Sequence, residues 1–348
     1  MLRTSLGKRM VAGKLHARTT DGFTLPILDV TDPATVPRYS QHQIDRIIAR
    51  TLIQFKRSGQ MPLRIRKWMA KHSILLRRMM TSGESYLDGV TTYMCKLGPE
   101  AYGGGLDGWM NRKVLGAIGP LTIRMRLHAY VRLIADELIP MLEVLTGSPL
   151  HMVNIAGGVA SDSWNVLLVI RRERPELLKG RQVRISVLDL ETEGPAFGLN
   201  VIEALTGGGA PLHGLEISFE HIPYDWCETR TLDELLNKQF SAKTAQAKNA
   251  APPIVTVSSE GGLFENGTDD EIHRHLKLLR EKVSGESVVF GSFVKDAPVL
   301  RAMQAAGRLT FFIRSEEDIS RLATESGWTI GGTRPGNPHY HMVSLKPR

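Results

Sequence analysis

The stretch His151-Met-Val-Asn-Ile-Ala-Gly-Gly-Val-Ala-Ser-Asp162 decides the fold of this chain. A short apolar run breaks into paired glycines, then small residues, and then polar residues that can open a helix. A second apolar run, Val187-Leu-Asp189, follows further along and ends on a carboxylate. This layout is typical of the first half of a nucleotide-binding α/β sheet. There the glycines let the backbone approach a ligand, and the acid accepts hydrogen bonds from ribose hydroxyls.

The glycine loop departs from the best-known nucleotide-binding pattern. It reads Ala156-Gly-Gly-Val-Ala160 and contains no G-x-G-x-x-G. Pyrophosphate binding is therefore not its natural interpretation. Paired glycines are also common in ordinary turns that connect a strand to a helix and bind no ligand. The case for a ligand consequently depends on what stands at the other strand ends.

Length and composition indicate a globular protein. A chain of 348 residues can bury one large core or two. Cys95 and Cys227 lie far apart in sequence and suggest neither a disulfide framework nor a metal site, and a cytoplasmic location is the default. The basic N-terminus is followed by no apolar segment, and no run approaches membrane-spanning length. Secretion and a membrane partner are therefore not expected.

Charge is unevenly distributed along the chain. Residues 1–150 carry 22 Lys and Arg against 11 Asp and Glu, whereas residues 151–348 carry 22 against 25. A basic half beside a neutral one can bind nucleic acid or acidic substrates. The basic residues alternate with Leu, Ile and Met in a helical pattern, which favours solvated helix faces over a nucleic-acid groove.

The chain divides into three parts. Residues 1–37 lack periodicity and are interpreted as an arm. Residues 38–147 show helical periodicity, and Pro140 inside the last helix predicts a kink or a break. Residues 148–348 alternate strands with helices, and this alternation predicts a doubly wound, mostly parallel sheet. Helix starts are marked by capping patterns at Thr231, Thr268 and Ser315.

Six runs in the last part have the composition of strands. They are Met152–Ile155, Val183–Leu188, Leu215–His221, Ile254–Val257, Ser287–Phe290 and Leu309–Ile313. A closing strand is expected over 339–346, after a turn that follows Glu325-Ser-Gly-Trp-Thr-Ile330. Such a turn-linked pair would end the sheet with a reversed strand.

Carboxylates stand at three of these strand ends. Asp189 ends the second strand, Asp225 follows the third between Tyr224 and Trp226, and Glu260 follows the fourth. Ligands of open α/β sheets bind outside the carboxyl ends of the strands. Taken alone, each of these acids could equally be a helix-cap or turn residue, and each aromatic residue could simply pack in the core. The set of three indicates a ligand site.

With the reversed closing strand, residues 148–348 resemble the class I S-adenosylmethionine (SAM)-dependent methyltransferases. That family has a seven-stranded sheet whose last strand is inserted antiparallel. The resemblance implies a doubly wound sheet of this kind, with SAM as the cofactor. The N-terminal part does not contribute to the resemblance, and its helical periodicity predicts an all-α domain that precedes the sheet. Two departures stand out. The first strand offers Asn154 in place of the family's acid, and the fourth lacks the Asn/Asp-Pro-Pro-Tyr pattern of base N-methyltransferases.

The resemblance also assigns roles to particular residues. The glycine loop would lie under the methionine part of the cofactor, Asp189 would hold the ribose, and Asp225 with its neighbours would take the adenine. Ser259 and Glu260 would stand where the methyl group is transferred. The implied cofactor-binding residues are Asn154, Ala156, Gly157, Gly158, Ser161, Asp189, Leu190, Tyr224, Asp225, Trp226 and Ser259.

Glu260 is the first candidate for a general base, which methyl transfer needs only when the acceptor arrives protonated. His221 is the second candidate, although a structural role suits it better, as it does His339 and His341. The helical N-terminal part would form a lid or a dimerisation element. Its aromatic residues, Tyr86, Tyr93, Tyr102 and Trp109, are candidates for lining an acceptor cavity.

The acceptor stays open at the level of sequence. A small-molecule O or N acceptor is the leading interpretation, and a homodimer is compatible with the apolar helical part. RNA or protein acceptors are the first alternative, because of the basic N-terminal half. An NAD-dependent oxidoreductase is disfavoured by the missing third glycine. A SAM-binding protein without turnover remains the last alternative.

Overall fold

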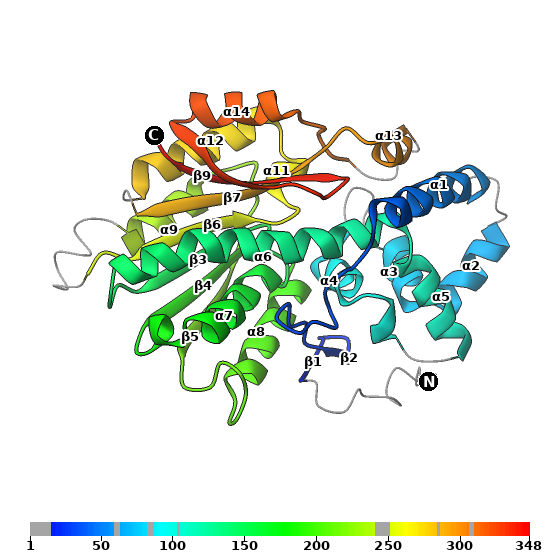
Figure 1. The fold of residues 1–348 in the computed structure, drawn as a ribbon, viewed down its shortest axis with the longest axis horizontal. Helices are drawn as coiled ribbons and strands as arrows, with labels where there is room; N and C mark the ends of the chain where they lie inside the picture. Colours follow the sequence, from blue (N-terminus) through cyan, green and yellow to red (C-terminus); the bar gives the residue numbers. More distant parts are fainter. Residues whose placement is uncertain are drawn as a thin grey trace.

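The computed structural model describes residues 15–58, 63–81, 87–102, 105–240, 251–283, 286–305 and 310–348. A seven-stranded sheet forms its centre, with helices on both faces (Figure 1). The strand order is β5-β4-β3-β6-β7-β9-β8. The strands are β3 (Leu150–Ile155), β4 (Gln182–Asp189), β5 (Glu216–Pro223), β6 (Ile254–Ser259), β7 (Ser287–Val294), β8 (Trp328–Arg334) and β9 (Tyr340–Pro347).

The pairing confirms the expected doubly wound sheet. β3 pairs in parallel with both β4 and β6, so the strand order reverses at β3. The last strand, β9, is antiparallel to both β7 and β8. This is the arrangement that the resemblance implied, a seven-stranded sheet with its last strand inserted antiparallel. β3 lies at the topological switch point, where open α/β sheets place their ligands.

Two hydrophobic cores hold the helices on the sheet. Successive residues of a strand point to opposite faces, so Met152 and Val153 of β3 belong to different cores. The Met152 core includes α6 (Ile118–Val144), α7 (Ser161–Glu173), α8 (Glu193–Thr206) and the 3-10 turn Pro175–Leu178. The Val153 core includes α9 (Arg230–Phe240), α11 (Leu263–Asn266), α12 (Asp269–Lys282) and α14 (Glu316–Glu325).

The helical N-terminal part packs directly against this sheet. Its helices are α1 (Gln41–Ser58), α2 (Leu63–Lys71), α3 (Ile74–Thr81), α4 (Gly89–Leu97) and α5 (Gly105–Leu115), with a 3-10 turn at Pro99–Ala101 between the last two. The long helix α6 ends it and lies along the sheet (Figure 1). The core that contains Met152 also contains Tyr93 of α4 and Tyr130 of α6. A boundary at residue 147 therefore cuts through one continuous core.

Several local expectations need correction. The lead-in is no simple arm, because it forms a hairpin of β1 (His16–Arg18) and β2 (Thr24–Pro26). The turn contains Asp21-Gly22, with Gly22 at φ 88°, a dipeptide that favours hairpins. The carbonyl of Arg18 accepts from Asn200 of α8, so the hairpin is attached to the sheet domain.

Two further expectations concern Pro140 and the sixth strand. Pro140 does not break α6, which continues to Val144. The run Leu309–Ile313 is no strand in its described part, where Ile313 makes an isolated bridge to Val294. Phe311 packs in a small separate cluster with helix α13 (Pro298–Ala305). The place of that strand in the sheet is taken by β8, which pairs with β9 as the expected hairpin.

The helix starts are mostly as expected. Capping boxes at Thr268 and Ser315 open α12 and α14. The expected start at Thr231 is displaced, because α9 already begins at Arg230. Within the part of the chain that the structure describes, no helix is both long and apolar enough to cross a lipid bilayer.

Candidate functional site

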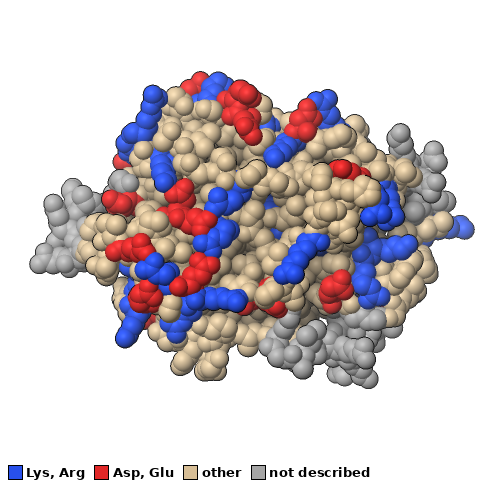
Figure 2. Space-filling model, in the orientation of Figure 1, with Lys and Arg blue, Asp and Glu red and all other residues tan. Residues whose placement is uncertain are grey.

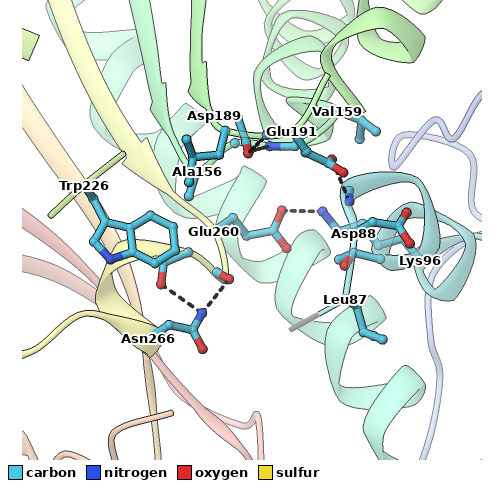
Figure 3. A pocket seen from close by; sticks show the side chains of 17 residues that line it. Leu87, Asp88, Lys96, Ala156, Val159, Asp189, Glu191, Trp226, Glu260 and Asn266 are labelled. Carbon is cyan, nitrogen blue, oxygen red and sulfur yellow. Dashed lines mark hydrogen bonds and ion pairs between the residues drawn. The ribbon is translucent and has the colours of Figure 1, made fainter. Parts of the chain in front are cut away.

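A cavity of about 480 Å³ opens at the carboxyl ends of β3, β4 and β6 (Figure 3). One wall is the glycine loop after β3 together with the end of β4, and the opposite wall is the start of α4. The loop after β6 forms its floor. The lining residues are Leu87, Asp88, Gly89, Thr92, Lys96, Ala156, Gly157, Gly158, Val159, Asp189, Leu190, Glu191, Trp226, Glu260, Gly261, Gly262 and Asn266.

The glycine loop is held in an unusual backbone conformation. Ala156 and Ala160 have φ values of 50° and 57°, and they are the described non-glycine residues with positive φ. Gly158 lies between them at φ 51°. Left-handed backbone at a side-chain-bearing residue costs about 1–2 kcal/mol. Strain of this kind clusters at ligand-binding sites, which makes this loop the strongest local sign of one.

Asp189 fixes this loop from the end of β4. Its Oδ2 accepts from the backbone N of Gly158 at 2.8 Å, and its Oδ1 accepts from the N of Glu191 at 3.1 Å. Burial raises the pKa of Asp189, while these backbone hydrogen bonds oppose the increase. The carboxylate therefore stands at the cavity wall, already oriented by the chain.

Glu191 was missed by sequence reasoning. Its Oε1 accepts from the backbone N of Gly89 at 2.7 Å, at the first residue of α4. A Cβ on Gly89 would lie 2.2 Å from this oxygen and 2.9 Å from Cα of Gly158. Glu191 thus joins the start of α4 to the strand end, across a gap that only glycines leave open.

Replacing Glu191 by glutamine is expected to stabilise the protein at about pH 8 and to change little at about pH 5. Burial, and then the charge of Asp189, raise the pKa of Glu191 to about 7. A carboxyl in the unfolded chain titrates near 4.3. The folded protein therefore binds more protons between these values, and its free energy of unfolding falls as pH rises through them. Glutamine still accepts from Gly89, and the expected gain is roughly 1–3 kcal/mol.

Urea unfolding of both proteins at the two pH values measures this difference. Burial also raises the pKa of Asp162 to about 6, but this residue contributes equally to the stability of both proteins and does not affect the difference between them. The control is Glu203→Gln, at an exposed position on α8. A Glu191→Gln protein no more stable than wild type at the higher pH contradicts the expectation.

A buried ion network closes the inner end of the cavity. Glu260 accepts from Lys96 Nζ at 2.8 Å and from Arg126 Nε at 3.1 Å. Arg126 also pairs with Glu265, which accepts from Ser292 at 2.9 Å. The side chains of Lys96, Arg126 and Glu260 are only 6, 2 and 4% exposed. Both carboxylate oxygens of Glu260 are therefore engaged by cations.

Three expected cofactor ligands lie beneath the loop and do not line the cavity. Asn154 and Ser163 exchange hydrogen bonds inside the core. The hydroxyl of Ser161 accepts from Lys96 at 2.8 Å, and that of Ser259 accepts from the backbone N of Leu263 at 2.9 Å. These side chains support the wall, and their expected direct contact with a ligand is corrected accordingly.

The end of β5 is also only partly as expected. Trp226 lines the cavity, whereas Tyr224 and Asp225 do not. The Tyr224 hydroxyl donates to His275 Nε2 at 2.5 Å inside the core, because the other ring nitrogen of His275 donates to a carbonyl. Asp225 is exposed, and its Oδ1 accepts from the N of Cys227. Because the side chains of these three successive residues point in different directions, Trp226 faces the cavity and the other two do not.

The candidate histidines have structural surroundings. His221 donates to the carbonyl of Asp189 at 3.0 Å, which helps to shape the strand end. His339 is buried against Thr122, and burial lowers its pKa to about 4. His341 lies 3.4 Å from Glu316. None of them is a member of the cavity wall.

The aromatic residues of the N-terminal part do not line the cavity where the structure describes them. Tyr93 and Tyr102 are buried in the core, and Trp109 is exposed to solvent. Tyr86 and Gly103-Gly104 lie outside the described residues. The N-terminal part instead reaches the cavity through Leu87, Asp88 and α4.

Seven of the residues expected at the site line the cavity. The cavity brings together, from the expected set, Ala156, Gly157, Gly158, Asp189, Leu190, Trp226 and Glu260. It adds Lys96 and Glu191, for which the local sequence contains no signal. Lys96 is a lone lysine on a helix, and Glu191 reads as a surface residue after a strand.

No protein-family model and no curated protein matches the chain. Among solved structures it is similar to a possible exported protein from Bordetella parapertussis, at a TM-score of 0.52 and 13% identity, over 91% of this chain and 99% of that one. That likeness covers the helical N-terminal part as well as the sheet. It therefore supports the fold of the whole chain.

Two methyltransferase structures are also similar. For mitomycin 7-O-methyltransferase MmcR the TM-score is 0.38 and the identity 16%, over 68% of this chain and 57% of that one. For magnesium protoporphyrin IX methyltransferase from Synechocystis PCC 6803 with bound SAH, the TM-score is 0.39 and the identity 12%, over 65% of this chain and 87% of that one. The chain spans little more than half the length of MmcR.

Proposed function

We propose that this protein binds SAM in the cavity beside β3 and transfers its methyl group to a small-molecule O or N acceptor. The observation that carries the proposal is the meeting of a strained glycine loop with the buried carboxylate of Asp189. The two meet at the switch point of a sheet whose last strand is inserted antiparallel. The family and the activity are inferred from this geometry together with the sequence pattern.

The donor set of the cavity fits the adenosine part of SAM. Asp189 presents a carboxylate that can accept from two ribose hydroxyls, at the end of a strand next to the loop. Trp226 and Leu190 supply flat and apolar surface on the neighbouring strand ends for a purine. The volume of about 480 Å³ is in the range of pockets that bury a ligand of this size.

The inner ion pair fits the amino-acid part of the same molecule. That part carries one ammonium and one carboxylate, and Lys96 and Glu260 present the opposite charges at the cavity wall, 2.8 Å apart. Charge-assisted hydrogen bonds of this kind are roughly twice as strong as neutral ones. We assign Lys96 to the carboxylate and Glu260 to the ammonium.

This assignment changes the role of Glu260. A general base must reach a proton of the acceptor, but both carboxylate oxygens of Glu260 already accept hydrogen bonds from Lys96 and Arg126. Glu260 is therefore better suited to positioning the cofactor than to acting as a base. When bound, SAM supplies an electrophilic methyl group on a sulfonium. The task of the chain is then to align the two reactants and exclude water.

The same ion pairs favour a second candidate function. Because the first candidate base, Glu260, is engaged by two cations, the protein could also bind SAM without transferring its methyl group. Appearance of S-adenosylhomocysteine (SAH) in a mixture of the protein, SAM and a panel of phenols and amines distinguishes the two. Product above the level of an Asp189→Ala control supports transfer. Binding of SAM without product supports the second candidate.

Replacing Lys96 by methionine is expected to weaken the binding of SAH roughly tenfold to a hundredfold, through loss of one charge-assisted contact. Binding of 5′-methylthioadenosine, which keeps the adenosine and lacks the amino-acid part, should change less than threefold, or about 0.6 kcal/mol. Calorimetric titration of both ligands measures the two effects.

The matched control is Lys113→Met on α5, which leaves the cavity intact. Equal losses for both ligands would show that Lys96 acts on the fold of the cavity and does not contact the amino-acid part. An unchanged affinity for SAH would remove Lys96 from the site.

A further inference from the structure

Two helices of the N-terminal part expose apolar side chains beside cationic ones. On α2, Ile65 and Trp68 are 47 and 49% exposed, and Arg64, Lys67 and Lys71 lie on the same exposed face. On α5, Leu106 and Trp109 are 45 and 47% exposed, with Lys113 Nζ 4.5 Å from the Trp109 ring centroid. We call these eight residues the docking face.

The two helices are attached to each other at this end of the molecule. The Trp68 ring lies 5.0 Å from the ring of His72, and His72 Nδ1 lies 3.3 Å from Asp107 of α5. Figure 1 places α1, α2 and α5 together at the right-hand end of the molecule, beyond the ends of the strands. His72, which follows α2, therefore connects the Trp68 end of that helix to α5.

Positive charge dominates around these helices. The segments 41–81 and 105–115 together hold twelve Lys and Arg and two acids, Asp45 and Asp107. Figure 2 shows mainly blue side chains over the right-hand end of the molecule, whereas red and blue are interspersed at the left. Two tryptophans and two aliphatic residues are thus exposed beside cationic side chains on these two helices.

In contrast to the expectation from sequence that the protein has no membrane partner, we propose that the docking face binds the surface of an anionic lipid bilayer. Tryptophan prefers the boundary between headgroups and acyl chains, and isoleucine and leucine gain by entering it. Lysine and arginine beside them are attracted to anionic headgroups, each contributing about a fivefold change in affinity. The face supplies both terms together, so the protein would attach peripherally, with its helices lying on the bilayer.

Two other occupants fit the face less well. A second copy of the chain in a twofold dimer would bring this positive face against itself, and like charges would then repel. A nucleic acid would satisfy the lysines and stack on tryptophan, yet it offers nothing to the exposed aliphatic residues Ile65 and Leu106. The combination of aliphatic, indole and cationic groups favours lipid.

Flotation of the full-length protein with vesicles tests the proposal. Vesicles of phosphatidylcholine mixed with phosphatidylglycerol should carry the protein, and vesicles of phosphatidylcholine alone should not. Tryptophan emission should shift to shorter wavelength on binding. Trp164 and Trp328 are already fully buried and Trp226 lines the cavity, so the part of the shift that disappears when Trp68 and Trp109 are replaced reports on the docking face. Added salt should weaken the binding.

Variants separate the two contributions. Lys67→Gln with Lys71→Gln should weaken binding about 25-fold, and Trp68→Ser with Trp109→Ser should abolish the spectral shift. The matched control is Lys238→Gln with Lys277→Gln, two exposed lysines on α9 and α12. Thermal unfolding of each variant checks that the fold is intact.

Several results would overturn the proposal. They are failure of the wild type to float with anionic vesicles, and flotation that neither pair of changes reduces. A preference for single-stranded RNA that vesicles cannot compete away would assign the face to nucleic acid. A dimer that dissociates when Trp68 is changed would assign it to a second copy. None of these results depends on SAM binding.

Discussion

Replacing Asp189 by alanine is expected to weaken the binding of SAM and SAH by about a hundredfold to a thousandfold. The carboxylate would accept from two ribose hydroxyls, and each hydrogen bond to a charged group contributes about 1.5–3 kcal/mol. Its loss also frees the backbone N of Gly158, which Asp189 now holds at 2.8 Å. Calorimetric titration with both ligands measures the effect.

The chain contains a matched control for this change. Asp225 also follows a strand at the same edge of the sheet, but it is exposed and does not line the cavity. Asp225→Ala should leave the affinity for SAH within about threefold of wild type, or about 0.6 kcal/mol. If both alanine variants lost binding equally, the adenosine site would not be where we place it.

Replacing Arg126 by leucine is expected to lower the free energy of unfolding by about 3–5 kcal/mol. Arg126 is buried on α6, between Glu260 and Glu265, and also lies 4.4 Å from the Tyr340 ring. Its removal leaves the buried carboxylates of Glu260 and Glu265 without their shared cation, and Lys96 still pairs with Glu260. Removing one partner of a buried ion pair typically carries this cost, because the other charge stays desolvated.

A second change should recover part of this loss. Burial already raises the pKa of Glu265, while the charge of Arg126 opposes that increase. Adding Glu265→Gln to Arg126→Leu removes the uncompensated charge and should restore about 1–2 kcal/mol. Arg132→Leu on the same helix is the control, since its pairs with Asp136 and Glu173 are exposed and contribute about 1 kcal/mol or less. Equal losses in the two single variants, measured by urea unfolding, would contradict the account.

Strands with β-branched apolar runs were predictable from sequence. Val183–Leu188 and Ile254–Val257 became β4 and β6 with only small shifts in their ends. Leu309–Ile313 has a similar composition, yet its described part packs in a side cluster and the sheet position goes to β8. Local composition indicates that a segment will be buried. Whether the segment becomes a strand of the sheet depends on its pairing with strands that are distant in sequence.

The site was predictable where chain order alone sets geometry. Parallel strands end at one edge, so Asp189, the glycine loop and Glu260 meet whatever the details of packing. Tyr224 was misplaced because the direction of a side chain after a strand end depends on the turn. Lys96 and Glu191 were missed because their partners are distant in sequence. Glu260 and Gly89 reach them only through tertiary contacts.

The measurement that tests the central claim most directly is calorimetric titration of the purified full chain with SAM and SAH, with NAD as the comparison ligand. The proposal predicts saturable binding of SAM and SAH that is weakened at least about a hundredfold by Asp189→Ala and kept on Asp225→Ala, with no binding of NAD. Binding of NAD alone, or of none of the three ligands, would contradict it.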